Sequence, residues 1–176
     1  MAKLSKPARG LPSPIAASLG RMIARWSYLE WLLAQILYQM CGVGPKIGRV
    51  AMPPPRASDY PARLQQVAAI LKLDLSPFPW ASYEKTLREL KEERDRFAHS
   101  IWLKDRREKE YRIQDVRGSW QPDPTMPSVS KRIMPYGRAV TSGDLNAIRR
   151  KIERAIRDAR TLSRFVSISL QVASAR

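Results

Sequence analysis

The sequence predicts an all-α fold, an up-and-down helical bundle of about four helices, with an inserted β-hairpin or extended arm at about residues 105–140. Two observations lead to this prediction. Four segments repeat apolar residues at spacings of three and four, the period of a helix with one buried face. Residues 105–140 instead contain two strand-like stretches around a loop rich in proline. We expect residues 1–13 to be a flexible basic tail and residues 14–176 to be a single domain.

The first helix is expected from about Pro14 to Met40, where Gly42 and Gly44 end it. Its apolar stripe also includes Glu30. A carboxylate buried there is costly unless it is paired, so Glu30 either reaches solvent at the edge of the stripe or pairs inside the bundle. We expect Cys41 to be a small buried side chain. The stripe consists of Leu19, Met22, Ile23, Trp26, Leu29, Leu33, Ile36, Leu37 and Met40.

Capping signals mark the starts of the second and the last helix. Ser58 or Asp59 can cap a short helix that runs to about Leu73. Thr141 and Asp144 have the spacing of a capping box, with Asp in place of the usual Glu or Gln. The second helix has Leu64, Val67, Ala68 and Leu71 on one face, and the last helix has Leu145, Ile148, Ile152, Ile156, Ala159, Leu162 and Val166.

The third helix is expected from about Trp80 to Lys104, and an arginine interrupts its apolar stripe. The stripe runs through Tyr83, Leu87, Leu90, Phe97 and Ile101. Its spacing requires one more apolar residue between Leu90 and Phe97, and the residue there is Arg94. Arginine is rarely buried without a partner, so this position indicates a specific role.

The net charge of +16, from 32 Lys+Arg and 16 Asp+Glu, favours a polyanionic partner such as RNA, DNA or an acidic protein. Arg150, Arg154 and Arg157 lie off the apolar face of the last helix, where they form either a solvated surface or a phosphate-binding surface. In the arm, Trp120 and Tyr136 are candidates for stacking on bases.

Other classes of function lack support in the sequence. One cysteine and one histidine cannot form a zinc site, and no nucleotide-binding loop is present, so we expect no metal and no cofactor. The most apolar stretch is too short to span a membrane, and the N-terminus lacks the apolar core of a signal peptide. These features fit a cytoplasmic protein.

The stretch KEERDRFAHSIW contains the only histidine, His99, and it combines three groups of complementary chemistry. A neutral imidazole can accept a proton from a hydroxyl at physiological pH. Asp95, four residues before His99, is placed to orient the ring, and Glu92 lies on nearly the same face. Arg94 offers a planar charged fork that suits phosphate oxygens. Base, orienting group and phosphate clamp together describe metal-free RNA cleavage by attack of the 2′-hydroxyl, which DNA lacks.

Arg94 and His99 are five residues apart and point about 140° from each other on a helix. They line one cleft only if neighbouring elements wrap around that side or if a second protomer completes the site.

The segment RDRFAH, Arg94 to His99, resembles the R-x4-6-H motif of HEPN-domain proteins. The preceding YLEWLL helix, the AHSIW that follows and the final amphipathic helix are also similar to that family. Asp95 departs from the asparagine that is common after the motif arginine. The resemblance covers about residues 14–104 and 141–172, without the arm.

The resemblance implies a helical bundle that dimerises, with the two motifs meeting in a cleft at the interface. Many members of the family are metal-independent endoribonucleases in toxin–antitoxin and phage-defence systems. Arg94 and His99 would be catalytic, and Asp95 would support them. Glu30 and Glu92 would support these residues without contacting the substrate, and Glu30 would do so by orienting Arg94. RNA, a second copy and an antitoxin or other protein are the partners implied.

Two other interpretations stay open. The chain is a non-catalytic nucleic-acid-binding module, or it is a protein-interaction module whose arm docks the partner. In both, His99 is a packing residue that bonds a backbone carbonyl, and Arg94 pairs with Glu30 to fix the helix register.

Overall fold

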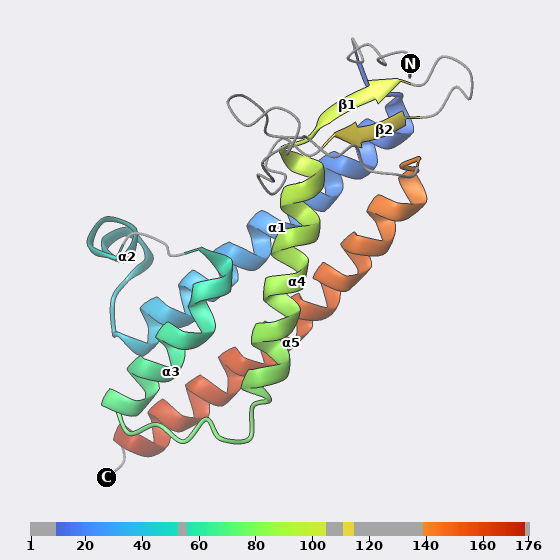
Figure 1. Cartoon of the computed structure of the whole chain (residues 1–176). Helices are drawn as coiled ribbons and strands as arrows, with labels where there is room; N and C mark the ends of the chain where they lie inside the picture. The colour runs from blue at the N-terminus through green and yellow to red at the C-terminus, as the bar shows by residue number, and fades with distance from the viewer. Residues whose placement is uncertain (1–9, 53–55, 105–110, 115–138, 175–176) are drawn as a thin grey trace, which may run out of the picture. The chain divides into compact units, whose positions relative to one another are not determined.

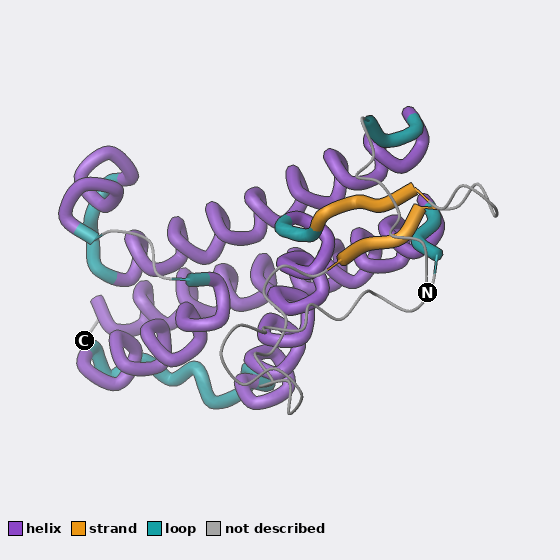
Figure 2. Tube along the Cα trace, turned by 45° about the horizontal axis from the view of Figure 1, so that its top comes forward, coloured by secondary structure: helices purple, strands orange, loops and turns teal. Residues whose placement is uncertain are grey.

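The computed structural model describes residues 10–52, 56–104, 111–114 and 139–174, and it confirms the all-α class (Figure 1). Helices account for most of the described chain, and two short strands follow the fourth helix (Figure 2). The helices are α1 (Ser13–Met40), α2 (Pro45–Ala51), α3 (Tyr60–Ile70), α4 (Trp80–Ala98) and α5 (Ser142–Ser174), with a 3-10 turn at Ala57–Asp59 before α3. The sequence patterns predicted four of these helices and missed α2.

The chain divides into two compact units, which are described separately below. The hairpin unit consists of residues 1–23 and 92–149, and the helical unit consists of residues 24–91 and 150–176. The chain passes from one unit to the other within α1, α4 and α5.

In the helical unit, α5 is joined to α1 and α4 by hydrogen bonds as well as by apolar packing. Arg25 contacts Glu153 and Gln39 contacts Ser167, so α1 and α5 run in the same direction. The Tyr83 hydroxyl of α4 donates a hydrogen bond to the Ala155 carbonyl at 3.2 Å. The side chains that fill the core of this unit include Trp26, Leu29, Leu33, Leu64, Leu87, Ile152 and Leu162.

The predicted apolar face of α5 is confirmed, since all seven of the residues named for it are buried. The predicted capping box is confirmed as well. The Asp144 carboxylate accepts hydrogen bonds from the Thr141 backbone N–H at 2.9 Å and from its hydroxyl at 2.8 Å. The Asp144 backbone N–H in turn donates to the Thr141 hydroxyl at 3.2 Å.

Three predictions of burial are wrong. Ile23 is exposed because it follows the fully buried Met22 by one position, about 100° around the helix. Leu71 is exposed because α3 ends at Ile70 and not near Leu73. Cys41 is exposed because it begins the turn after α1, where Gly42 adopts a positive φ of 66°.

In the hairpin unit, the predicted helix to Lys104 is wrong, because α4 ends at Ala98 and a strand begins three residues later. Strand β1 (Ile101–Lys104) pairs antiparallel with β2 (Tyr111–Gln114), with Trp102 opposite Ile113. The Ser100 hydroxyl donates to the Arg96 carbonyl, which satisfies a backbone acceptor where the helix ends. Ile, Trp and Leu in succession favour a strand once β2 provides its partner.

The expected strand in EYRIQDV is therefore present, and the hairpin begins a few residues before the predicted arm. Ile113 of β2 is fully buried, and the Val140 N–H donates to the Tyr111 carbonyl at 2.7 Å, which attaches the start of the last segment to the hairpin. The second expected strand, VSKRIMPY, lies outside the described residues.

We expect Thr141→Ala to lower the free energy of unfolding by about 1 kcal/mol, because it removes one half of the capping box. Urea unfolding followed by circular dichroism measures this change. The matched control is Thr161→Ala, which removes an exposed mid-helix hydroxyl that bonds the Arg157 carbonyl. Alanine is the better helix former there, so the control should be neutral or stabilising. An equal loss of unfolding free energy in both variants would contradict a stabilising role for the capping box.

We expect Tyr83→Phe to lower the free energy of unfolding by about 1 kcal/mol, because the Tyr83 hydroxyl hydrogen-bonds inside the core. Burial raises the pKa of Tyr83, with the Asp158 carboxylate adding to the effect, so the hydroxyl remains a donor across the physiological range. The control is Tyr60→Phe. Tyr60 is also buried, but its hydroxyl has no hydrogen-bond partner among the described residues, so this loss should be absent.

Candidate functional site

The residues of the predicted motif lie at the C-terminal end of α4, within the hairpin unit. Arg94 and Asp95 belong to the last turns of the helix, and His99 is the first residue after it. The helix therefore ends between the two residues that were predicted to stack on one face, Asp95 and His99.

Arg94 occupies the apolar stripe as the sequence predicted, and its charge is neutralised locally. Its side chain is only 20% exposed, and its Nη1 lies 2.7 Å from Oδ1 of Asp95, whose side chain is 14% exposed. A half-buried guanidinium in an ion pair is held in a defined orientation, which suits a role that depends on its planar fork.

His99 is exposed, and its backbone rather than its ring contacts Asp95. The His99 N–H donates to the Asp95 carbonyl at 3.1 Å. Within the described part of the chain, no hydrogen bond reaches the His99 ring, so the expected Asp95–His99 side-chain bond is not formed. The Asp95 carboxylate lies against Arg94 instead. The structure thus brings Arg94 and Asp95 together and leaves the imidazole accessible to solvent.

The other residues predicted to support the motif differ in their surroundings. Glu92 is exposed on α4. Glu30 belongs to the helical unit, where it lines a cavity. Trp102 is half-buried on β1, with its ring 6.5 Å from that of Phe97, which fits a packing role. Trp120 and Tyr136, the predicted stacking residues, lie outside the described residues.

Arg150, Arg154 and Arg157 are exposed on α5, and together with Arg164 they form what we term the arginine stripe. Their spacings of four, three and seven place them on one face, directly opposite the buried face of α5. Successive members of the first three are about 6 Å and about 4.5 Å apart along the helix axis, at a rise of about 1.5 Å per residue. Exposed guanidinium groups in a row on one face can contact several phosphates, so the stripe can follow a nucleic-acid backbone.

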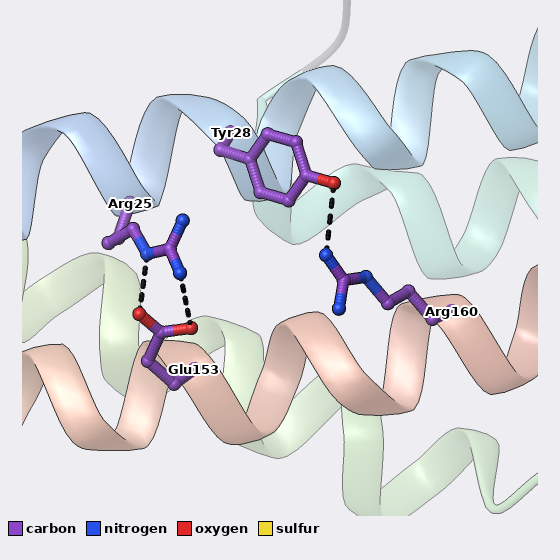
Figure 3. Close-up of polar contacts among 4 residues, drawn as sticks. All are labelled: Arg25, Tyr28, Glu153 and Arg160. Carbon is purple, nitrogen blue, oxygen red and sulfur yellow. Dashed lines mark hydrogen bonds and ion pairs between the residues drawn. The ribbon is translucent and has the colours of Figure 1, made fainter.

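Sequence reasoning missed a cluster between α1 and α5 of the helical unit, formed by Arg25, Tyr28, Glu153 and Arg160 (Figure 3). Arg25 contacts both carboxylate oxygens of Glu153, and Arg160 donates to the Tyr28 hydroxyl at 3.3 Å. Both guanidinium carbons lie 5.9 Å from the centre of the Tyr28 ring. The hydrogen bond with Glu153 and the charge of its carboxylate raise the pKa of Arg25.

The cluster ends at an exposed aromatic surface. The Tyr28 ring stacks on Trp31 with centroids 5.6 Å apart and an interplanar angle of 23°. Trp31 remains 45% exposed. The spacing of three from Arg25 to Tyr28 and from Tyr28 to Trp31 is visible in the sequence, and it was the signal that could have identified this surface.

The described residues contain no group of three or more side chains able to hold a metal ion. None of their helices is long and apolar enough to cross a membrane. The chemistry on offer is therefore an accessible imidazole, a positioned guanidinium and a basic surface with aromatic rings, which together suit a phosphate-containing polymer.

No family model, no curated protein and no solved structure matches this chain, so the candidate site is interpreted from its own residues.

Proposed function

We propose that this protein binds RNA and cleaves it without a metal ion, using His99 as the general base and Arg94 as the phosphate clamp. The observation that carries the proposal is the placement of Arg94. A charged side chain sits where the helix pattern requires an apolar one, pairs with Asp95, and lies five residues before the only histidine, which is exposed.

In the proposed reaction, His99 takes the proton of an RNA 2′-hydroxyl, and the oxygen attacks the adjacent phosphorus. The bond from phosphorus to the 5′-oxygen breaks, and that oxygen takes up a proton from water as it leaves, while the protonated His99 returns its proton to solvent. The products are a 2′,3′-cyclic phosphate and a 5′-hydroxyl. Arg94 stabilises the charge that develops on the phosphate oxygens, since its fork suits two of them.

The proposal includes a homodimer of HEPN type, in which one copy supplies the arginine and the other the histidine. The large angle between Arg94 and His99 favours this arrangement over a site within one chain. The exposed imidazole is also in a position to gain an orienting partner from a second copy. A toxin or phage-defence effector with a protein antitoxin is the biological setting that the resemblance suggests.

The second candidate function is non-catalytic RNA binding or protein interaction. The observation that favours it is the His99 ring, which receives no hydrogen bond from the described residues of its own chain. The arginine stripe needs no catalysis to bind phosphates, so it supports either candidate. Cleavage assays therefore distinguish the two.

We expect the wild-type protein to cleave single-stranded RNA in EDTA, and His99→Ala to lower the rate by about 100-fold or more, as for loss of a general base. Arg94→Lys should also lose most activity, because lysine keeps the charge but not the fork. Gel analysis of end-labelled RNA measures the rate, and mass spectrometry identifies the cyclic phosphate.

The control for the Arg94 variant is Arg88→Ala, which removes an exposed arginine from the same helix and should leave the rate unchanged. RNA with 2′-O-methyl groups should resist cleavage. Mixing the His99→Ala and Arg94→Ala proteins should restore up to about a quarter of the activity if each site takes one residue from each copy. Unchanged cleavage by His99→Ala would contradict the proposed base, and intact RNA binding without cleavage would favour the second candidate.

We expect alanine substitutions at Arg150, Arg154 and Arg157 to weaken RNA binding and to reduce the slope of log Kd against log salt by about 2, at about 0.7 per phosphate contact. Fluorescence anisotropy with a single-stranded RNA at several salt concentrations measures the slope. The matched control removes three exposed basic residues outside α5, namely Lys46, Lys85 and Arg88. An equal change of slope in the control would mean that net charge, and not the stripe, binds the RNA.

A further inference from the structure

The ring of Trp31 is exposed on α1 and is held in place by contacts that reach across to α5. Trp31 is 45% exposed, and its ring stacks on Tyr28 with centroids 5.6 Å apart. Tyr28 is held in turn by Arg160 of α5, which donates to the Tyr28 hydroxyl at 3.3 Å (Figure 3). Because these contacts restrict the ring before any ligand arrives, Trp31 offers an aromatic surface at a low cost in side-chain entropy.

Arg160 connects this aromatic pair to the arginine stripe. It is exposed, and it lies three residues after Arg157 and four residues before Arg164. Residues at these spacings are neighbours on the surface of a helix, so the three guanidinium groups form one continuous basic surface. We term Tyr28, Trp31 and Arg160 the stacking platform. The platform and the stripe both belong to the helical unit.

A further cation lies near Trp31, beside a partly open cavity of about 470 Å³ that Trp31 lines. Gly48 of α2 is buried against the Tyr38 ring, and a Cβ there would lie 2.6 Å from the ring carbons, so only glycine permits this contact. The next residue, Arg49, is exposed and lines the same cavity. Glu30 also lines it, but this half-buried side chain already interacts within the protein, so we assign it no ligand contact.

The combination of an exposed aromatic ring and a row of arginines limits the chemistry of the ligand. A sugar ring or a proline stacks on tryptophan, but neither carries the negative charge that the arginines attract. An acidic peptide carries that charge and leaves the ring unused. A single-stranded nucleic acid alternates flat bases with phosphates and so fits both features, whereas the bases of a duplex are already paired and stacked. The net charge of +16 agrees with a polyanionic ligand.

We infer that an unpaired base of single-stranded RNA stacks on Trp31, while the neighbouring phosphates contact Arg160 and the arginine stripe. This inference rests on the proposed RNA binding, and it adds the place where a base is held and the preference for single strands. We expect little sequence preference, because every base has an aromatic face. The platform lies in the helical unit, and Arg94 and His99 lie in the hairpin unit, so stacking and cleavage are tested separately.

The experiment uses the full-length wild-type protein and three fluorescent probes that resist cleavage. The first is a 2′-O-methyl RNA dodecamer of mixed sequence. The second is the same strand paired with its complement, and the third is an abasic strand with the same backbone and charge. Fluorescence anisotropy measures the Kd of each probe. We expect the single strand to bind at least about fivefold more tightly than the abasic strand, because only the first offers a base to stack.

The decisive variant is Trp31→Leu, which keeps an apolar side chain and removes the aromatic ring. It should weaken binding of the single strand at least about fivefold. Its affinity for the duplex and for the abasic strand should be unchanged, which also shows that the arginine stripe is intact. Trp31→Phe should restore most of the affinity for the single strand. The matched control is Ile70→Ala, which removes an apolar side chain of α3 that is 78% exposed and should change nothing.

Arg160→Gln tests the phosphate contact separately from the stacking. Glutamine removes the charge and keeps an N–H donor for the Tyr28 hydroxyl. We expect the slope of log Kd against log salt to fall by about 0.7 for the single strand and for the abasic strand alike. An unchanged slope for both strands would overturn the assignment of a phosphate to Arg160.

Three results would overturn the inference as a whole. The first is that no probe binds. The second is equal affinity for the strand with and without bases, since the surface would then bind any polyanion, including an acidic protein. The third is a Trp31→Leu variant that weakens all three probes equally or none of them. Cleavage of unmodified RNA together with any of these results would leave the proposed function standing and remove the stacking platform alone.

Discussion

Burial of one face of α5 is the interaction on which the helical unit depends. Ile152, Ile156, Ala159, Leu162 and Val166 of this helix are fully or almost fully buried, and hydrogen bonds join α5 to α1 and to α4. At about 25 cal/mol for each Å² of apolar surface removed from water, burial of this face stabilises the unit. The polar contacts from Arg25 to Glu153 and from Tyr83 to Ala155 then fix how the three helices align.

The same burial organises the charged surface. Because one face of α5 must point into the core, the arginines at spacings of three and four are forced onto the opposite face, where they form the arginine stripe. Glu153 and Arg160 fall between the two faces, and there they meet Arg25 and Tyr28 of α1 (Figure 3). Three faces of α5 therefore have different roles: one packs in the core, one contacts α1, and one carries the exposed arginines.

The sequence was sufficient for the parts of the fold that depend on periodicity and capping. The buried apolar face of α5 and the pairing of Thr141 with Asp144 were predicted from the spacing of the residues. The same spacing predicted that Arg94 occupies a half-buried position on α4. The end of α4 did not follow, because Phe97 and Ile101 continue the helical spacing while Ile101 to Leu103 also suit a strand, and only the pairing with β2 decides between them.

For the functional sites, too, the sequence predicted the features that depend on local spacing and missed those that depend on tertiary packing. The motif residues were found from their chemistry, but the end of α4, one residue before His99, was not. The cavity of the helical unit that is lined by Tyr38, Arg49 and Tyr60 could not be predicted from the sequence. It requires α2, a short helix without an amphipathic pattern, to fold back with Gly48 against Tyr38.

The exposed Cys41, which follows α1, is the only thiol in the chain. A thiol-reactive dye will therefore attach at one defined point of the wild-type protein, so counting dyes per particle in single-molecule photobleaching reads the number of subunits directly.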